Sequence, residues 1–481
     1  MTKKQKLLTL IIIPSVLAIA AGAFYFISRS RSAYLNALPA EVKALARFDL
    51  PTFAGEADVP VEAFVDFVRH SRSMEKVASG IDFSRPLYAF AANSGYFGAV
   101  AAVADDNDFA ALCEEMHAQG RASAIARQRG FSWVTLLGQW LCAFDGSRAL
   151  VMGPATASAQ DQLRTEMARL LTQNKDGSGQ ESSYFQQLAK HSGAAVAMVG
   201  PELFPPRPRL LLYKAGIRSH DDALIRLQLT TRNNELQLVG AVDAFTDEAK
   251  QQIAQLGNVL RPMQGELAAH AHRENSGWIG LNVEGRKLLN YMRYHRGFRS
   301  ALIALNLAFD LDNILSSVNG DVALEFTPDF SPTPSKLVSF DFHGIYLTAR
   351  LADTRCFDGS ASWGNNYVDV QRLGHLDYSL GIGGERYFLG ASDNILYLGS
   401  ERGLAAGGNK QLTSATVAGK RFYATFATPH LFKLLSGLTT VPPALRKFER
   451  ITLDLDQTNT AHLRLLAPEG THIVKELLSN E

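Results

Sequence analysis

Two histidines, His270 and His272, have the spacing in this 481-residue chain that comes closest to a metal site. Residues two apart on a strand point to the same side, so both imidazoles could bind one ion. Glu266 and Glu274 are near enough in sequence to add carboxylate oxygens. The segment also lies at the expected junction between two halves of the chain, where solvent-exposed polar residues are common. We therefore predict no cofactor and no metal, and we keep this pair as the ligands to test if an ion binds.

A run of aromatic and basic residues follows between positions 291 and 299. Its candidate contact residues are Tyr291, Arg293, Tyr294, Arg296 and Arg299. Tyrosine and arginine dominate the energetic centres of interfaces, because they combine a large area with directional hydrogen bonds. An anionic glycan, a lipid headgroup or a partner protein would suit this patch. In the alternative interpretation, the aromatic rings face the core and the arginines stabilise the carboxyl end of a helix.

Three motifs come close to known catalytic or ion-binding patterns and fail. A nucleophile elbow needs glycine two residues before and two after its serine, but Ser362 has Ser360 before it and Gly364 after it. Gly381–Gly384 leads into a strand-like segment, which lacks the helix amides that bind phosphate. Asp105–Asp108 lacks the glycine and the distal glutamate of a calcium loop, and it suits a helix cap. No catalytic residue is predicted, although a hydrolase site could still be assembled from scattered residues.

The elements that must position these residues begin with an apolar run at the amino terminus. Residues 7–27 are apolar, three lysines precede them and two arginines follow. At about 1.5 Å of rise per residue, this run would cross the ~30 Å hydrocarbon core of a bilayer. We predict a cytoplasmic basic tail at 1–6 and a transmembrane signal-anchor helix at 7–27, with a cleaved signal peptide as the alternative. The flanking charges predict a single-pass protein of the bacterial inner membrane, with its body in the periplasm.

The composition of the chain is that of a globular protein. It is 46% hydrophobic and 20% charged, and its net charge of +1 argues against a nucleic-acid partner. Cys113, Cys142 and Cys356 are odd in number and widely spaced, so disulfides are not the basis of the fold. A bond between Cys113 and Cys142 and buried free thiols both stay open, and free thiols are favoured.

Four segments of the body begin in the same way, with a short strand, a polar or Pro/Gly break and an amphipathic helix. These opening segments are Val42–Leu50, Ala194–Val199, Trp278–Val283 and Phe422–Ala427. Two strands around a turn follow each opening, as at Asn93–Gly95, and a helix then closes the unit. We therefore predict an α+β fold: an N-terminal transmembrane helix, then repeated strand–helix–hairpin–helix units whose antiparallel sheets are covered by helices. The two α+β halves are predicted at 38–264 and 275–481.

Four stretches carry a resemblance to a known family. They are LPAEVKALARFDL (Leu38–Leu50), SGIDFSRPLYAF (Ser79–Phe90), NVEGRKLLNYM (Asn282–Met292) and SVNGDVALEF (Ser317–Phe326). On these stretches the chain resembles an uncharacterised family of membrane-anchored envelope proteins, mostly from Bacteroidetes, known only as a domain of unknown function. Many members have a lipoprotein cysteine that this chain lacks. The family has no established activity, so the resemblance implies repeated α+β halves and assigns no functional residue.

These patterns predict a membrane-tethered, extracytoplasmic binding or scaffolding protein of the bacterial cell envelope rather than an enzyme. Its expected partners are the membrane, through residues 7–27, and an envelope protein or an anionic ligand. Nucleic acid is not expected. Two alternatives stay open: an envelope hydrolase whose site is assembled from scattered residues, and a metal- or anion-binding sensor.

Overall fold

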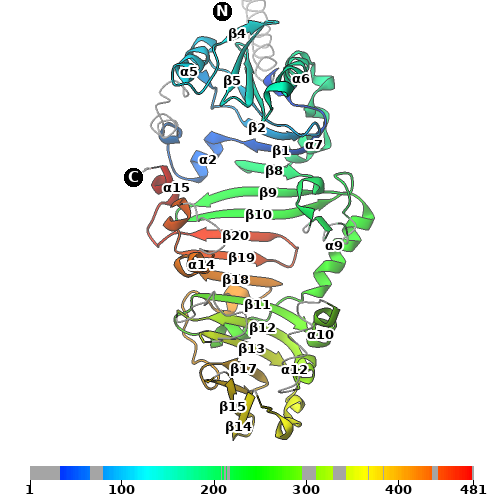
Figure 1. The fold of residues 1–481 in the computed structure, drawn as a ribbon, viewed down its shortest axis with the longest axis vertical. Coiled ribbons are helices and arrows are strands. Elements are labelled where there is room, and N and C mark those ends of the chain that lie inside the picture. The colour runs from blue at the N-terminus through cyan, green and yellow to red at the C-terminus, as the bar shows by residue number, and fades with distance from the viewer. Residues whose placement is uncertain are drawn as a thin grey trace, which may run out of the picture. The chain divides into compact units, whose positions relative to one another are not determined.

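The described part of the chain forms two compact units. The computed structural model describes residues 33–64, 80–206, 209–210, 213, 217–294, 310–328, 343–366, 368–382, 384–435 and 443–478. The first unit contains the chain up to Tyr213, Ile217–Arg232 and the residues from Val474 onward. The second unit consists mainly of Asn233–Ile473. Figure 1 shows that both units contain many strands, with helices beside them.

Nine strands of the described chain form an antiparallel sheet in the first unit. Their order across the sheet is β4 (Ala126–Gln128), β5 (Phe131–Leu136), β6 (Trp140–Phe144), β7 (Arg148–Gly153), β3 (Phe97–Ala102), β2 (Leu87–Ala92), β1 (Val42–Phe48), β8 (Ala195–Val199) and β9 (Ala223–Arg232). The turn between β2 and β3 contains Gly95 at φ 91°, a conformation that side chains disfavour. The turn predicted at Asn93–Gly95 is therefore confirmed.

Helices lie on both faces of this sheet. The helices of the first unit are α2 (Leu50–Glu56), α5 (Asp106–Ala118), α6 (Gln160–Thr172) and α7 (Ser183–Leu188). The face toward α7 carries Leu45, Phe90 and Met198, each at most 4% exposed. Tyr88 on the same face stacks on Phe185 of α7, with ring centroids 5.9 Å apart. Removal of this apolar area from water is the main stabilising contribution to the unit.

Two local predictions hold in the first unit. Asp105 caps α5, because its side chain accepts hydrogen bonds from the backbone N–H groups of Asn107 and Asp108. All three cysteines are buried free thiols, as favoured from the sequence. Cys113 and Cys142 lie in one apolar cluster, and burial raises the pKa of Cys113 to about 11.

Eleven strands of the described chain form the sheet of the second unit. Their order is β14 (Val368–Gly374), β15 (Asp377–Ile382), β16 (Glu385–Ser392), β17 (Ile395–Gly399), β13 (Ile345–Leu351), β12 (Val318–Phe326), β11 (Gly277–Glu284), β18 (Phe422–Ala427), β19 (Arg450–Leu455), β20 (Ala461–Leu466) and β10 (Glu235–Ala244). All of these neighbours are antiparallel. The first strand of the unit in sequence, β10, thus pairs with the last, β20.

The helices of the second unit are short. They are α9 (Asp247–Val259), α10 (Gly285–Tyr294), α12 (Leu311–Ser317), α13 (Ser414–Val417) and α14 (Thr428–Leu435), followed by α15 (Ile473–Leu478) at its boundary. The 3-10 turns of both units are η1 (Ala33–Ala37), η2 (Ala157–Ala159), η3 (Lys175–Gly177), η4 (Gly179–Glu181), η5 (Pro201–Leu203), η6 (Glu266–His270), η7 (Arg355–Phe357), η8 (Ser360–Ser362) and η9 (Pro443–Lys447). One face of the sheet is covered in part by η6 and α13, whose Leu267 and Val417 pack with Trp278 and Tyr423.

The predicted α+β fold with a transmembrane helix is wrong. Twenty strands with antiparallel partners dominate the described chain, and the helices between them are few. The pairing of the strands is the cause. After Ala194–Val199 the chain makes a 3-10 turn, Pro201–Leu203, and residues 206, 209, 210 and 213 are helical. Strands far apart in the chain nevertheless pair into extended antiparallel sheets, which the residue pattern of a single segment does not indicate.

The predicted localisation is also contradicted. In the part of the chain that the structure describes, each helix is too short or too polar to cross a bilayer. The predicted anchor at 7–27 and the basic tail at 1–6 lie outside the described residues. The prediction of a single-pass protein of the inner membrane with a periplasmic body is therefore withdrawn.

Candidate functional site

One face of the sheet in the second unit carries buried polar side chains. Residues paired in register on antiparallel strands point to the same side, which places Glu325 beside Trp278 and Thr425 beside Thr452 on this face. The buried polar residues of the face are Asn282, Asp321, Glu325, Thr425, Thr452 and Asp454, each at most 5% exposed. A buried polar group without a partner is costly. A buried polar group whose hydrogen bonds and ion pairs all lie within the protein serves the fold and does not need a ligand.

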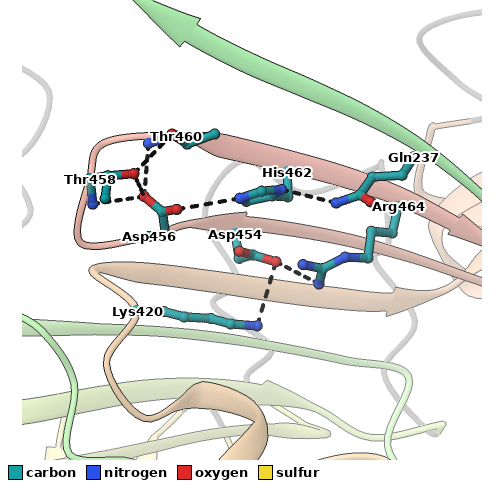
Figure 2. Close-up of polar contacts among 8 residues, drawn as sticks. All are labelled: Gln237, Lys420, Asp454, Asp456, Thr458, Thr460, His462 and Arg464. Atoms are coloured by element: carbon teal, nitrogen blue, oxygen red, sulfur yellow. Dashed lines mark hydrogen bonds and ion pairs between the residues drawn. The ribbon is translucent and has the colours of Figure 1, made fainter. Parts of the chain in front are cut away.

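Asp454 lies at the centre of a charge network, which Figure 2 shows. Its Oδ1 lies 2.7 Å from Nη1 of Arg464 and 3.5 Å from Nζ of Lys420. Arg464 also places Nε 3.5 Å from Oε1 of Glu235. The ammonium of Lys420 lies 4.4 Å from the ring centre of Tyr423, and burial lowers the pKa of Lys420. Every charge in this network has an opposite charge beside it, so the network does not require a ligand.

A second polar group closes the turn between β19 and β20 (Figure 2). Oδ1 of Asp456 accepts hydrogen bonds from the backbone N–H groups of Thr458 (2.8 Å) and Thr460 (2.9 Å). Burial opposes the charge of Asp456, but the hydrogen bonds from the Thr458 hydroxyl, the two backbone N–H groups and His462 together lower its pKa. His462 has Nε2 3.5 Å from Oδ2 of Asp456 and Nδ1 2.9 Å from Nε2 of Gln237. Both ring nitrogens are thus engaged, and the pair orders the turn.

Asp321 binds the start of η6, the 3-10 turn that covers part of the polar face. Its carboxylate accepts from the backbone N–H of Gly265 at 2.7 Å and from Nδ2 of Asn282 at 2.8 Å. Gly265 begins η6 at φ 85°, and a Cβ there would lie 2.5 Å from the carbonyl oxygen of Ser414. The close approach of η6 to α13 therefore requires glycine.

His272 forms an ion pair with Glu325 of this face. Its backbone N–H and its ring Nδ1 each lie 2.9 Å from an oxygen of the Glu325 carboxylate. Nε2 lies 3.8 Å from Oε2 of Glu401, and the ring packs on Tyr346 with centroids 4.3 Å apart. The hydrogen bond to Glu325 raises the pKa of His272 in spite of burial. The imidazole is therefore held by the buried carboxylate of Glu325 on one side and lies near the exposed carboxylate of Glu401 on the other.

The other candidate metal ligand, His270, ends η6 and does not join this ion pair. Among the residues that the structure describes, no three His, Cys, Asp or Glu side chains converge as a metal site would require. His272 instead forms a hydrogen-bonded contact with Glu325, which is 53 residues away in sequence.

A pocket of about 390 Å³ lies beside His272. It is lined by Arg273, Glu274, Asn275, Gly408, Asn409, Lys410, Gln411 and Arg450. These residues come from the segment before β11, from the loop before α13 and from the first position of β19. The volume lies in the range of pockets that take small molecules.

Hydrogen bonds fix the walls of the pocket. Nδ2 of Asn409 donates to the carbonyl oxygen of His272 at 2.9 Å, and Oδ1 of Asn409 accepts from the backbone N–H of Gln411 at 3.0 Å. Asn275 donates from Nδ2 to Oε1 of Glu325 at 3.2 Å. One carboxylate therefore positions both His272 and the pocket residue Asn275. The site is organised before any ligand arrives, which lowers the entropic cost of binding.

The pocket is rich in cations that lack a counter-ion. Arg273, Lys410 and Arg450 form no ion pair with any described residue. Nη1 of Arg450 donates to Oγ1 of Thr425 at 3.2 Å, and burial lowers the pKa of Arg450. Glu274 is the carboxylate in the lining. Within the described chain, Oδ1 of Asn275 is buried without a hydrogen-bond partner.

Comparison with known families now identifies the chain. A family model described as a domain of unknown function, DUF4836, matches residues 73–430. The chain belongs to the DUF4836 family. The predicted resemblance to a family of unknown function is confirmed at this level. The comparison with curated proteins finds no match.

Solved structures add little to this assignment. Crystal form I of TP0453 has 10% sequence identity, covers 47% of this chain and 86% of its own, and gives a TM-score of 0.29. Crystal form IV of TP0453 has 11% identity, covers 43% of this chain and 79% of its own, and gives the same TM-score. At this TM-score the likeness supports no conclusion about the fold or the function.

The DUF4836 match contains most of the pocket. Residues 273–275 and 408–411 lie within it, whereas Arg450, Asp454 and Arg464 lie beyond its end. No sequence motif indicated the pocket, because its three segments are far apart in the chain. The only local signal was the glycine pair Gly407-Gly408, which indicates a loop. A Cβ at Gly407 would lie 2.1 Å from the carbonyl oxygen of Ala269.

The predicted aromatic and basic patch is separate from the pocket lining. Tyr291, Arg293 and Tyr294 belong to α10, and Arg293 pairs with Asp312 of α12. Arg296 and Arg299 lie outside the described residues. The patch therefore stays a prediction.

Proposed function

We propose that this DUF4836 protein is a non-catalytic binding protein whose ligand occupies the pocket beside His272. One observation carries this proposal: the walls are fixed by hydrogen bonds, while the cations in the lining have no counter-ion. The fold itself does not use these cations, so they can interact with a ligand. The proposal keeps the expected binding role and leaves out the membrane tether.

Binding is favoured over hydrolysis by the residue types in the pocket. A hydrolase needs a nucleophile or a general base directed at the substrate. The lining contains arginine, lysine, amide, glycine and one glutamate side chain, without serine, cysteine or histidine. The nearest imidazole, His272, is engaged by Glu325.

We also propose that the two units share a repeated plan. The order β7-β3-β2-β1-β8-β9 in the first unit corresponds to β17-β13-β12-β11-β18-β19 in the second. Each order follows from the same connections along the chain. This correspondence supports the internal repeat that the sequence predicted.

The binding proposal is tested by filling the pocket. A panel of neutral and acidic metabolites is screened by thermal unfolding of the wild type, Gln411→Trp and Gln371→Trp. Gln411 lines the pocket, whereas Gln371 is exposed on β14 and serves as the matched control. A ligand at 100 times its Kd stabilises the folded state by about 2.7 kcal/mol.

We expect at least one compound to raise the Tm of the wild type and of Gln371→Trp, but not that of Gln411→Trp. The proposal is contradicted if every panel compound leaves the wild type unchanged. It is equally contradicted if the active compound stabilises Gln411→Trp to the same extent as the wild type.

A further inference from the structure

We infer that the ligand of this pocket is a small phosphate monoester that also carries hydroxyl groups, the chemistry of a sugar phosphate. The inference rests on the proposed binding function and adds the class of ligand. It is drawn from the charges of the lining, from one buried acceptor and from the size and residue types of the pocket.

The charge of the lining selects a doubly charged anion. Arg273, Lys410 and Arg450 face one carboxylate, Glu274, which leaves two positive charges in excess. A phosphate monoester carries about −1.5 to −2 at pH 7, whereas a simple carboxylic acid carries a single charge. Guanidinium groups also match phosphate oxygens with paired hydrogen bonds. A phosphate therefore compensates the pocket more completely than a carboxylate does.

One buried acceptor in the wall has no donor within the described chain. Oδ1 of Asn275 has no partner in the described chain, because Nδ2 of the same amide is directed at Glu325. The carboxylate of Glu274 and the amide of Gln411 offer further acceptors in the lining. A phosphate dianion has no hydrogen to donate to them. The remainder of the ligand must supply donors, and hydroxyl groups do so.

The pocket also argues against larger or aromatic phosphates. Its volume of about 390 Å³ suits a compact molecule. None of its lining side chains is aromatic, so a nucleobase would find no ring to stack on. A small hydroxylated phosphate fits these properties together.

The test is isothermal titration calorimetry of the full chain with four probes: glucose 6-phosphate, glucuronate, glucose and inorganic phosphate. We expect glucose 6-phosphate to bind at least tenfold more tightly than glucuronate or inorganic phosphate, and glucose to give no measurable heat. Glucuronate reports on the charge of the anion, and inorganic phosphate reports on the contribution of the hydroxyl groups.

Two variants test which residue binds the phosphate group and which binds the hydroxyl groups. Lys410→Ala removes an exposed cation and should weaken both phosphates at least tenfold, whereas Lys190→Ala in the first unit should change neither. Asn275→Ala removes the buried acceptor and should lower the preference for glucose 6-phosphate over inorganic phosphate, so that the two affinities approach each other. Because Lys410 is exposed, its replacement keeps the test valid if Asn275→Ala folds poorly.

The outcomes separate the inference from the proposed function. The inference is overturned if glucose or glucuronate binds as tightly as glucose 6-phosphate, or if inorganic phosphate alone accounts for the affinity. It is also overturned if none of the four probes binds while another panel compound binds and Gln411→Trp abolishes that binding, in which case the binding function stands. If glucose 6-phosphate binds Gln411→Trp as it binds the wild type, both the inference and the proposed pocket are wrong.

Discussion

Six strands of each unit follow a corresponding order, yet the two faces that they carry differ. In the first unit, the face formed by Leu45, Phe90 and Met198 is apolar and packs under α7. In the second unit, the face at the corresponding strands carries Glu325 and Thr425, and its cover is η6 and the four-residue α13. The order of strands therefore does not decide the use of the sheet. The residue types of the strands and of the covering segments do, because they decide whether the buried side chains of the face are apolar or polar.

The strongest test of this comparison removes apolar area from the first unit. Leu45→Ala should lower the free energy of unfolding by about 3 kcal/mol, because a 1% exposed leucine leaves a cavity. Leu453→Ala is the control in the second unit, where the side chain is 41% exposed and the loss should stay below about 1 kcal/mol. Urea unfolding measures both. Equal losses would mean that the two faces do not differ as described.

The next largest effect should come from the polar face. Glu325→Ala leaves His272 and Asn275 without their shared acceptor and should cost about 2 kcal/mol, as expected for hydrogen bonds to a charged group. It should also loosen the pocket wall and weaken ligand binding. Glu401→Ala is the matched control, because Glu401 is exposed and 3.8 Å from His272. A Glu325→Ala protein as stable as Glu401→Ala would show that the polar face contributes little.

A smaller effect should depend on pH. The pKa of His272 is raised in the folded state by its hydrogen bond to Glu325. Its contribution is therefore fully present below the ordinary histidine pKa of about 6.5, and it is lost as the pH rises through the raised pKa. Urea unfolding from pH 5.5 to pH 9 should show this loss in the wild type and not in His272→Gln. Parallel pH profiles of the unfolding free energy for the two proteins would show that His272 does not cause the pH dependence.

The smallest effect is expected at the exposed ion pair of α10. Arg293→Ala breaks the pair with Asp312, yet the arginine side chain is 53% exposed. Exposed pairs contribute about 0–1 kcal/mol, so chemical denaturation should detect little change. A loss as large as that of Glu325→Ala would instead place the main polar contribution of the second unit in its helices.

Local features of the fold were predictable from the sequence. The opening strands at Val42, Trp278 and Phe422 and the cap at Asp105 were found, because alternation and capping depend on neighbouring residues. The extent of the antiparallel sheet was underestimated. Alternation indicates a strand, but it does not indicate which distant strand pairs with it.

The site was predictable only in part. His272 was singled out from its spacing to His270, but its partner Glu325 is fixed by the register of β11 and β12. Arg450 enters the pocket because β19 pairs with β18, whose Thr425 receives its hydrogen bond. These contacts depend on long-range strand pairing, for which no local pattern of residues carries a signal.

The pairing of β10 with β20 has a consequence for synthesis of the chain. Gln237 and His462 meet across these strands although 225 residues separate them. At a translation rate of about 5–20 residues per second, β10 leaves the ribosome about 10–45 s before its partner. During that interval the edge of β10 that β20 will cover has unpaired backbone groups, and a strand from a neighbouring nascent chain can bind there. Chaperones that bind extended segments therefore have their clearest point of action on this chain at β10.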